Sequence, residues 1–374
     1  MKIILAEPIS PGQYFWLITT SVVVGGVYIW PQYVVMAAKQ NAPWSILGSV
    51  LVAYGLIWLR ASWAAYTQGI SYADVLRKTW GAIGMWLVFV LSLSIGIVLD
   101  MALLALYGQL MHTIFYEATP RFVIELLVVG AAAWIASKSL NGLARNVQFW
   151  FPGLVLLVLI IVYLSLHHLH YWGALTPSNM VQYLPILHGI GVTWYLFVQG
   201  EGMIYLATQV RNTTRRQTRR LAGWAILFQG FWLMLFYVVV VGTIGPQATE
   251  VLRWPIVYVF SSVIIQSFFL SGVGTLILLT WSIALTLYLA VQLFCWSWNL
   301  EIMLDIGAKT RAIIVVALAL ITIIGSSLIP SPVWANSVVL NFVNPVDMIC
   351  TAVILVPSFG ISWLKFRHRR QEIA

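Results

Sequence analysis

The sequence predicts an all-α, polytopic membrane protein with ten transmembrane helices. The helices are expected to form a five-plus-five inverted repeat with broken first and sixth helices. Of the 374 residues, 61% are hydrophobic and 8% are charged, whereas a soluble domain carries about 25% charged residues. Apolar runs of membrane-spanning length follow one another with short loops between them. Two of these runs, five spans apart, are interrupted by glycine.

Apolar runs of about 20 residues predict the individual spans. The ten runs lie at about 12–36, 43–64, 81–113, 122–139, 147–167, 185–208, 221–244, 268–296, 312–329 and 339–364. The third and eighth runs exceed the bilayer thickness and should tilt or protrude. Segment 251–266 is shorter and contains Arg253 and Pro255, which favours an interfacial helix. Residues 1–374 are therefore expected to form a single transmembrane domain.

The basic residues predict the orientation of these spans. With a cytoplasmic N-terminus, most of them, including Arg60 and the run 211–220, lie inside, and only Lys39, Arg121 and Arg253 lie outside. Such an excess of cytoplasmic Lys and Arg is typical of membrane proteins. Both termini are thus expected in the cytoplasm. The net charge of +9 is attributed to topology and to contact with membrane lipid, and no nucleic-acid partner is expected.

The sixth span, 185–208, is interrupted by Gln199, Gly200, Glu201 and Gly202. A carboxylate in hydrocarbon costs about 2.5–3.5 kcal/mol on insertion scales, and the glycines beside it weaken the helix. Irregular backbone at membrane depth is tolerated where it lines a cavity or is buried in protein. We therefore expect an unwound helix at a ligand or ion site, with Glu201 as its polar anchor.

The first span carries a matching interruption, because Gly25 and Gly26 are followed by Pro31. Five spans separate the two breaks, so the two halves, about 9–168 and 183–364, would have inverted topology. Free N–H groups at the half-helix ends favour a carboxylate, and free carbonyls favour a cation. The alternative is that the two glycines only permit close helix packing.

Other polar and aromatic residues lie within the apolar runs. Asp100 in the third span is either a proton site, an ammonium partner or a structural hydrogen-bonding group. Trp281 and Ser282 in the eighth span are candidates to face the pocket. Glu125 is expected to form a one-turn ion pair with Arg121.

Asp347 is expected to cap the helix that starts after Pro345. The chain has no recognisable catalytic constellation, metal-ligand spacing or cofactor motif. We therefore expect no enzymatic activity and no cofactor.

Several motifs, in order, resemble those of the spore germination permease family. The segment Ile9–Phe15 resembles the family's opening I-S-x-x-Q-x-F, and Leu196–Gly202 is similar to F-x-F-G-E at the broken sixth span. Arg253–Ile256 and the pattern from Trp281 to Leu293 also match in character. The family comprises the B subunits of nutrient germinant receptors, within the amino acid–polyamine–organocation transporter superfamily.

The resemblance implies a pocket between spans one, three, six and eight. Its candidate ligand-binding residues are Gly25, Gly26, Tyr28, Asp100, Met101, Phe197, Gly200, Glu201, Gly202, Trp281 and Ser282. It also implies a small nutrient ligand such as an amino acid, a larger A subunit and a lipoprotein C subunit as partners, and a location in the bacterial plasma membrane or the spore inner membrane. The expected function is nutrient sensing that triggers germination. The alternatives are an autonomous ion-coupled amino acid transporter and a purely structural subunit.

Overall fold

The computed structural model describes residues 8–23, 28–66, 71–177, 181–197, 206–207, 209–211, 214–262 and 273–366. Within these ranges the chain is helical, and the one recorded β contact is an isolated parallel bridge between Ile9 and Val210. The α-helices are α1 (Pro11–Val23), α2 (Trp30–Ala38), α3 (Ala42–Tyr66), α4 (Tyr72–Ile114), α5 (Arg121–Ala136), α6 (Leu140–Ser165), α7 (Tyr183–Thr193), α9 (Arg215–Val251), α10 (Pro255–Ser261), α11 (Val273–Leu304), α12 (Ala308–Ser327), α13 (Pro332–Val338), α14 (Asn344–Cys350) and α15 (Val356–Phe366). Short 3-10 helices follow several of them: η1 (Lys39–Asn41), η2 (Leu166–His168), η3 (Trp172–Leu175) and η4 (Trp194–Leu196).

Seven helical segments in the described ranges are long and apolar enough to cross a membrane. This agrees with the all-α membrane class. The expected count of ten is not reached, because α5 has only 16 residues and the first and sixth expected spans consist of shorter helices. The ten-span count and the inverted repeat therefore stay predictions.

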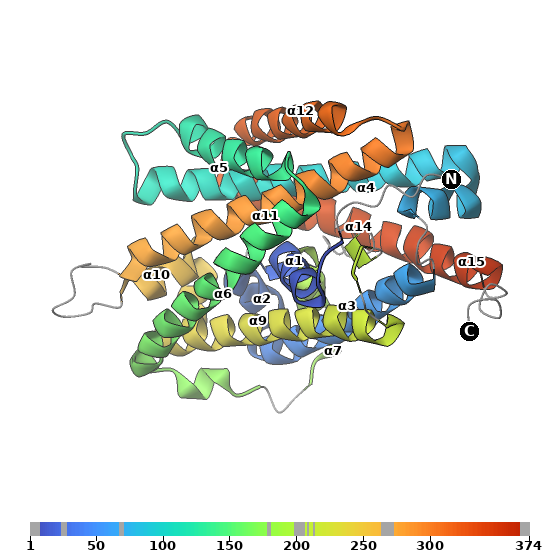
Figure 1. The fold of residues 1–374 in the computed structure, drawn as a ribbon. Helices are drawn as coiled ribbons and strands as arrows, with labels where there is room; N and C mark the ends of the chain where they lie inside the picture. Colours follow the sequence, from blue (N-terminus) through green and yellow to red (C-terminus); the bar gives the residue numbers. More distant parts are fainter. Residues whose placement is uncertain are drawn as a thin grey trace.

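The helices pack in two groups (Figure 1). One group contains α1, α2, α3, α7 and α9, and the other contains α4, α5, α11 and α12. Helix α6 contacts both α1 and α11. Residues from the third and eighth expected spans therefore lie in one group, while those from the first and sixth lie in the other.

The first expected span consists of two helices. Helix α1 ends at Val23, Tyr28 and Ile29 form a turn, and α2 begins at Trp30. Pro31 lies in the first turn of α2, where its missing N–H costs no helical hydrogen bond. The predicted interruption lies between these helices, but Gly25 and Gly26 themselves fall outside the described residues.

The sixth expected span changes conformation near its predicted break. Helix α7 ends at Thr193, η4 follows over Trp194–Leu196, and Phe197 forms a turn. Gly200, Glu201 and Gly202 fall outside the described residues. Beyond them, the Ile9 amide donates to the Gln209 carbonyl at 3.0 Å. This contact, between the start of the first span and the segment after the sixth, is expected if the two spans run antiparallel.

Two long helices bend at glycines in the left-handed region. Gly81 has φ 77° within α4, and Gly245 has φ 79° within α9, a conformation that glycine adopts without a Cβ penalty. The expected third span, 81–113, thus begins at the bend of α4. After α9, the seven-residue helix α10 packs against α9 and α11, within the segment 251–266 that was expected to form a short separate helix.

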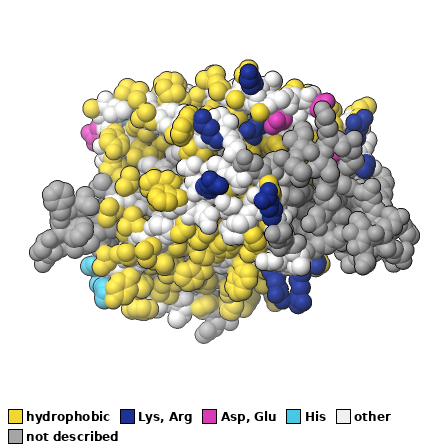
Figure 2. Space-filling model, in the orientation of Figure 1, with side chains coloured by type: hydrophobic (Ala, Val, Ile, Leu, Met, Phe, Trp, Pro, Cys, Tyr) yellow, Lys and Arg dark blue, Asp and Glu magenta, His cyan; other side chains and the backbone are white. Residues whose placement is uncertain are grey.

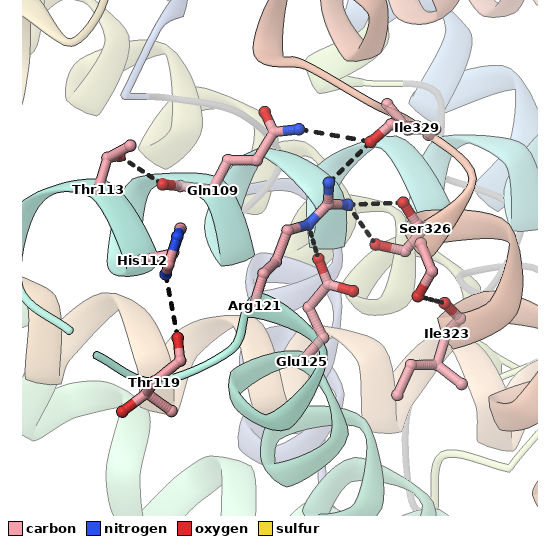
Figure 3. A network of polar contacts seen from close by, with 10 residues as sticks. Gln109, His112, Thr113, Thr119, Arg121, Glu125, Ile323, Ser326 and Ile329 are labelled. Atoms are coloured by element: carbon pink, nitrogen blue, oxygen red, sulfur yellow. Dashed lines mark hydrogen bonds and ion pairs between the residues drawn. The ribbon is translucent and has the colours of Figure 1, made fainter. Parts of the chain in front are cut away.

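A polar network joins one end of α12 to α4 and α5 (Figure 3). Arg121 Nε donates to Glu125 Oε1 one helical turn away, which confirms the expected ion pair, and the Glu125 side chain is fully buried. The other nitrogens of Arg121 donate to the carbonyls of Ser326 at 2.6 Å and Ile329 at 2.7 Å. Carbonyls at a helix C-terminus lack helical partners, so Arg121 caps α12.

A buried arginine, Arg311, contacts neighbouring segments at the opposite end of α12. Arg311 Nε lies 3.3 Å from Glu301 Oε2 of α11, and Arg311 Nη2 donates to the Lys138 carbonyl beyond the end of α5 at 2.9 Å. Its guanidinium also lies over the Phe294 ring, 4.8 Å from the centroid. Charged side chains thus connect α12 to α5 at one end, and to α11 and the segment after α5 at the other.

The surface is apolar, as expected for contact with lipid. Figure 2 shows hydrophobic side chains over much of the described face in view. Large apolar residues such as Leu127 and Ile313 are 70% and 69% exposed, whereas soluble proteins rarely expose contiguous apolar patches of more than a few hundred Å².

Candidate functional site

The flanks of the two interrupted spans contact each other. Trp30, the first residue of α2, donates from Nε1 to the Thr193 hydroxyl at the end of α7, at 3.0 Å. Both side chains are fully buried, and α2 packs against α7. Trp30, which follows the first break, and Thr193, which lies one helical segment before the second, are therefore in contact, although the glycines lie outside the described ranges.

An aromatic cluster connects the turn of the first span to the other helix group. The Tyr28 ring stacks on the Trp281 ring of α11, with centroids 3.7 Å apart and planes at 28°. Tyr107 of α4 approaches the same indole edge-on, at 5.3 Å and 87°. Since Tyr28 comes from one helix group and the other two rings from the second, this cluster bridges the groups.

A small cavity lies against this cluster. It is lined by Tyr28, Ile29, Leu103, Leu106, Trp254, Trp281 and Leu285. These residues come from the first-span turn, α4, the segment before α10, and α11. Trp281 Nε1 is buried and has no hydrogen-bond partner within the described residues. A buried donor without a partner is costly, so this indole N–H is available to an acceptor on a bound molecule.

Two hydrogen bonds join α4 to α11 beside the cavity. The Ser282 hydroxyl donates to the Leu278 carbonyl at 2.7 Å, so the Tyr107 hydroxyl, 2.7 Å from Ser282 Oγ, is the donor of that pair. Two turns away, the Tyr288 hydroxyl donates to Asp100 Oδ1 at 2.9 Å. Asp100 is 1% exposed and Tyr288 is fully buried.

Asp100 therefore has a structural partner, one of the roles that the sequence left open. The roles in proton or ammonium binding remain hypotheses. Tyr107 was not identified from the sequence, although it lies seven residues after Asp100, and this spacing places two residues on one helix face. A tyrosine seven residues after a buried aspartate is a signal that sequence reasoning could have used.

Two other predicted pocket residues lie elsewhere. Met101 packs against Gly325 of α12, where a Cβ on the glycine would lie 2.3 Å from the Met101 sulfur. Phe197 lines a different cavity, together with Trp194 and Asp347. The described structure thus places Tyr28, Trp281 and Ser282 at one site and Asp100 about two helical turns away from it. Gly25, Gly26, Gly200, Glu201 and Gly202 fall outside the described residues.

Comparison with known sequences identifies one family. The family model described as "Spore germination protein" matches residues 8–332. No curated protein sequence matches the chain.

Solved structures of transporters resemble the fold. Mhp1, a nucleobase-cation-symport-1 family transporter in a closed conformation with bromovinylhydantoin bound, is 15% identical, with a TM-score of 0.68 over 100% of this chain and 83% of its own. MhsT in complex with L-phenylalanine is 17% identical, with a TM-score of 0.61 over 94% and 88%. A Na⁺-coupled sialic acid symporter in a substrate-bound, outward-open state is 9% identical, with a TM-score of 0.69 over 95% and 78%. Similarity at these identities establishes the fold alone.

Proposed function

Since the chain belongs to the spore germination protein family, we propose that it is the nutrient-sensing membrane subunit of a spore germinant receptor. A small nutrient such as an amino acid would bind between the two interrupted spans and trigger germination. The larger A subunit and the lipoprotein C subunit would be its partners, in the plasma membrane or the spore inner membrane with both termini in the cytoplasm. The family match confirms the resemblance that the sequence motifs indicated.

The observation that carries this proposal is the aromatic cluster of Tyr28, Tyr107 and Trp281. It lies where the turn of the first span meets α4 and α11, beside a cavity with a free indole N–H. A mostly apolar pocket with few polar groups is typical of small-molecule sites. The Trp30–Thr193 hydrogen bond also brings the sixth span to this region.

The chemistry of the breaks supports an amino acid as the ligand. Unpaired N–H groups at half-helix ends attract a carboxylate, and unpaired carbonyls attract an ammonium group. We propose that Gly25 and Gly26 contribute backbone contacts and that Glu201, between Gly200 and Gly202, is the polar anchor. The similar fold of MhsT was solved with L-phenylalanine, which is consistent with this ligand class.

Binding would act by shifting the balance between two arrangements of the helices. A ligand favours one arrangement only by its difference in affinity for the two. Because Tyr28 and Trp281 belong to different helix groups, a ligand at their stack contacts both groups. The A subunit would then respond to the altered arrangement.

The test uses spores in which a Trp281→Leu variant replaces the wild-type chain. The variant removes the free indole N–H that would donate to the ligand. A hydrogen bond contributes about 0.5–1.5 kcal/mol net, so the amino acid concentration for half-maximal germination should rise by about twofold to tenfold. Trp134→Leu, at a residue that is 66% exposed, is the matched control and should leave the dose unchanged. An unchanged dose response for Trp281→Leu at normal protein level would contradict the proposed pocket.

The transporter fold favours a second candidate function, autonomous ion-coupled amino acid transport. Asp100 or Glu201 would then carry the proton. Uptake of labelled amino acids into liposomes that contain only this chain would support the transporter. Absence of uptake, together with co-purification of a membrane partner, would support the receptor subunit. A purely structural subunit predicts that Glu201→Gln alters assembly without changing the nutrient dose response.

A further inference from the structure

A second cavity lies apart from the aromatic cluster and contains two opposite charges. It is lined by Ser49, Ala53, Leu56, Ile57, Arg60, Ile190, Trp194, Phe197, Ile226 and Asp347. These residues come from α3, α7 with η4, α9 and α14, and none of them lines the cavity beside Tyr28 and Trp281. Spans two, six, seven and ten therefore meet around this second polar site.

Arg60 is buried in the wall of this cavity. Charge sorting along the sequence placed it among the cytoplasmic residues, but its side chain lies within α3 and is only 4% exposed. Its Nε has no hydrogen-bond partner within the described residues. A charged group inside a membrane helix is costly, and such groups normally face a partner or a water-filled cavity. The guanidinium therefore requires a polar neighbour.

Asp347 provides the opposite charge. It is 6% exposed, and its carboxylate accepts from Trp194 Nε1 at 2.7 Å and from the Thr351 hydroxyl. Its role is therefore a contact with the sixth span. The expected capping by Asp347 is wrong, because α14 continues directly from the π-helical stretch before it and has no side-chain cap hydrogen bond. Asn344 of the same helix donates to the Gly191 carbonyl of α7 at 3.0 Å. Helix α14 is thus hydrogen-bonded to the sixth span at two points.

The backbone around Asp347 is unusual as well. Helix α14 is flanked by π-helical stretches, Val339–Val343 before it and Thr351–Leu355 after it. π-helical turns are rare and occur frequently at functional sites. A wider turn on each side changes the helical register, and the intervening segment directs Asn344 and Asp347 towards the sixth span.

The two charges interact without touching. Arg60 and Asp347 line the same cavity and attract each other electrostatically, but no direct ion pair joins them among the described residues. The cavity between them measures about 20 Å³. One water requires about 10–15 Å³ by this measure and two to four polar partners. Ser49 lines the same cavity and donates to the Ser45 carbonyl at 2.7 Å, which leaves its oxygen free to accept.

We propose that this cavity binds a single water molecule that bridges the Arg60 guanidinium to the Asp347 carboxylate. The water accepts from Arg60 and donates to Asp347, with Ser49 as a further acceptor. The hydrated charge pair connects spans two and ten, and Trp194 extends the connection to the sixth span. No residue that lines this cavity also lines the cavity beside Tyr28 and Trp281, so the hydrated charge pair is a structural centre distinct from the proposed nutrient pocket.

The first test measures thermal unfolding of the purified full-length chain in detergent for Arg60→Met, Asp347→Asn and the double variant. Each single change leaves a buried charge without its partner, so each should lower Tm by several degrees. The double variant removes both charges and should lose clearly less Tm than the sum of the two singles. Additive losses would overturn the pairing. Arg311→Met, Glu301→Gln and their double variant serve as the control. These residues form a direct ion pair, so they show how far the Tm losses depart from additivity when two charges are paired.

The second test detects the water itself by radiolytic hydroxyl labelling of the wild-type chain. Phe197 lines the cavity and is 9% exposed, so it should be labelled despite its burial. Phe294, which is 1% exposed and lies under the directly paired Arg311, should remain unlabelled. Absence of labelling at Phe197, or labelling of Phe197 that persists in the double variant, would overturn the bridging water. Neither test depends on a nutrient, so their failure is distinguishable from failure of the proposed function.

Discussion

The hydrogen bond between Tyr288 and Asp100 offers a direct test of how the third and eighth spans are held together. Tyr288→Phe removes one hydroxyl and leaves the ring in place. Asp100 is 1% exposed, and its one recorded hydrogen bond within the described residues is the 2.9 Å contact with Tyr288. The variant therefore leaves a buried carboxyl group without that donor.

The magnitude of the effect follows from the burial. A buried polar group that loses its partner costs about 1–3 kcal/mol in soluble proteins, whereas hydrogen bonds between membrane helices average about 0.6 kcal/mol, with a maximum of about 1.7. We expect Tyr288→Phe to lower the free energy of unfolding by about 1–2 kcal/mol, which is where these two ranges overlap. At about 2 °C for each kcal/mol in a large domain, the loss in Tm is about 2–4 °C.

The assay is thermal unfolding of the purified chain in detergent, followed by intrinsic fluorescence. Adding Asp100→Leu to Tyr288→Phe removes both partners and should recover part of the lost stability. Tyr163→Phe removes a hydroxyl from a side chain that is 62% exposed and should leave Tm unchanged. A Tm for Tyr288→Phe equal to that of the wild type, or a double variant less stable than the single, would refute the reasoning.

Three further outcomes are expected. Gly325→Leu should lower the free energy of unfolding by about 1–3 kcal/mol through overpacking against Met101. Adding Met101→Ala to this variant should restore part of the lost Tm, and an unchanged Tm would exclude that contact as the cause. Arg121→Gln should lower the free energy of unfolding by about 3–5 kcal/mol, because it leaves the buried Glu125 carboxylate without its partner. The double variant with Glu125→Gln should be more stable than Arg121→Gln alone, and equal Tm values for these two variants would contradict the reasoning. Gly25→Leu should abolish nutrient-triggered germination at normal protein level by blocking the break, and normal germination would remove Gly25 from the pocket.

Local chemistry made part of the architecture predictable. The membrane class follows from composition, because a chain with 8% charged residues cannot provide the charged surface of a soluble domain. The first-span interruption was also predictable, because Pro31 cannot continue a helix from the preceding turn. The Arg121–Glu125 ion pair was predictable as well, because residues four apart on a helix are neighbours.

Contacts between distant segments were not predictable from these patterns. Asp100 and Tyr288 are 188 positions apart, and Trp30 and Thr193 are 163 apart. Periodicity shows which face of a helix is apolar, but it does not show which helix packs against that face. Met101 illustrates this limit, because it is adjacent to Asp100 in sequence and yet packs on α12.

The sequence by itself determined that this chain lies in a membrane, that its first expected span is interrupted, and to which family it belongs, because each of these depends on composition or on residues close together along the chain. Only the tertiary structure decided which polar groups are partners. Arg60 could be assigned to the cytoplasm from its place near the end of an apolar run, but the packing of four helices buries it beside Asp347. Burial is a property of the assembled bundle, and the free energy of a charge depends on the groups that surround it.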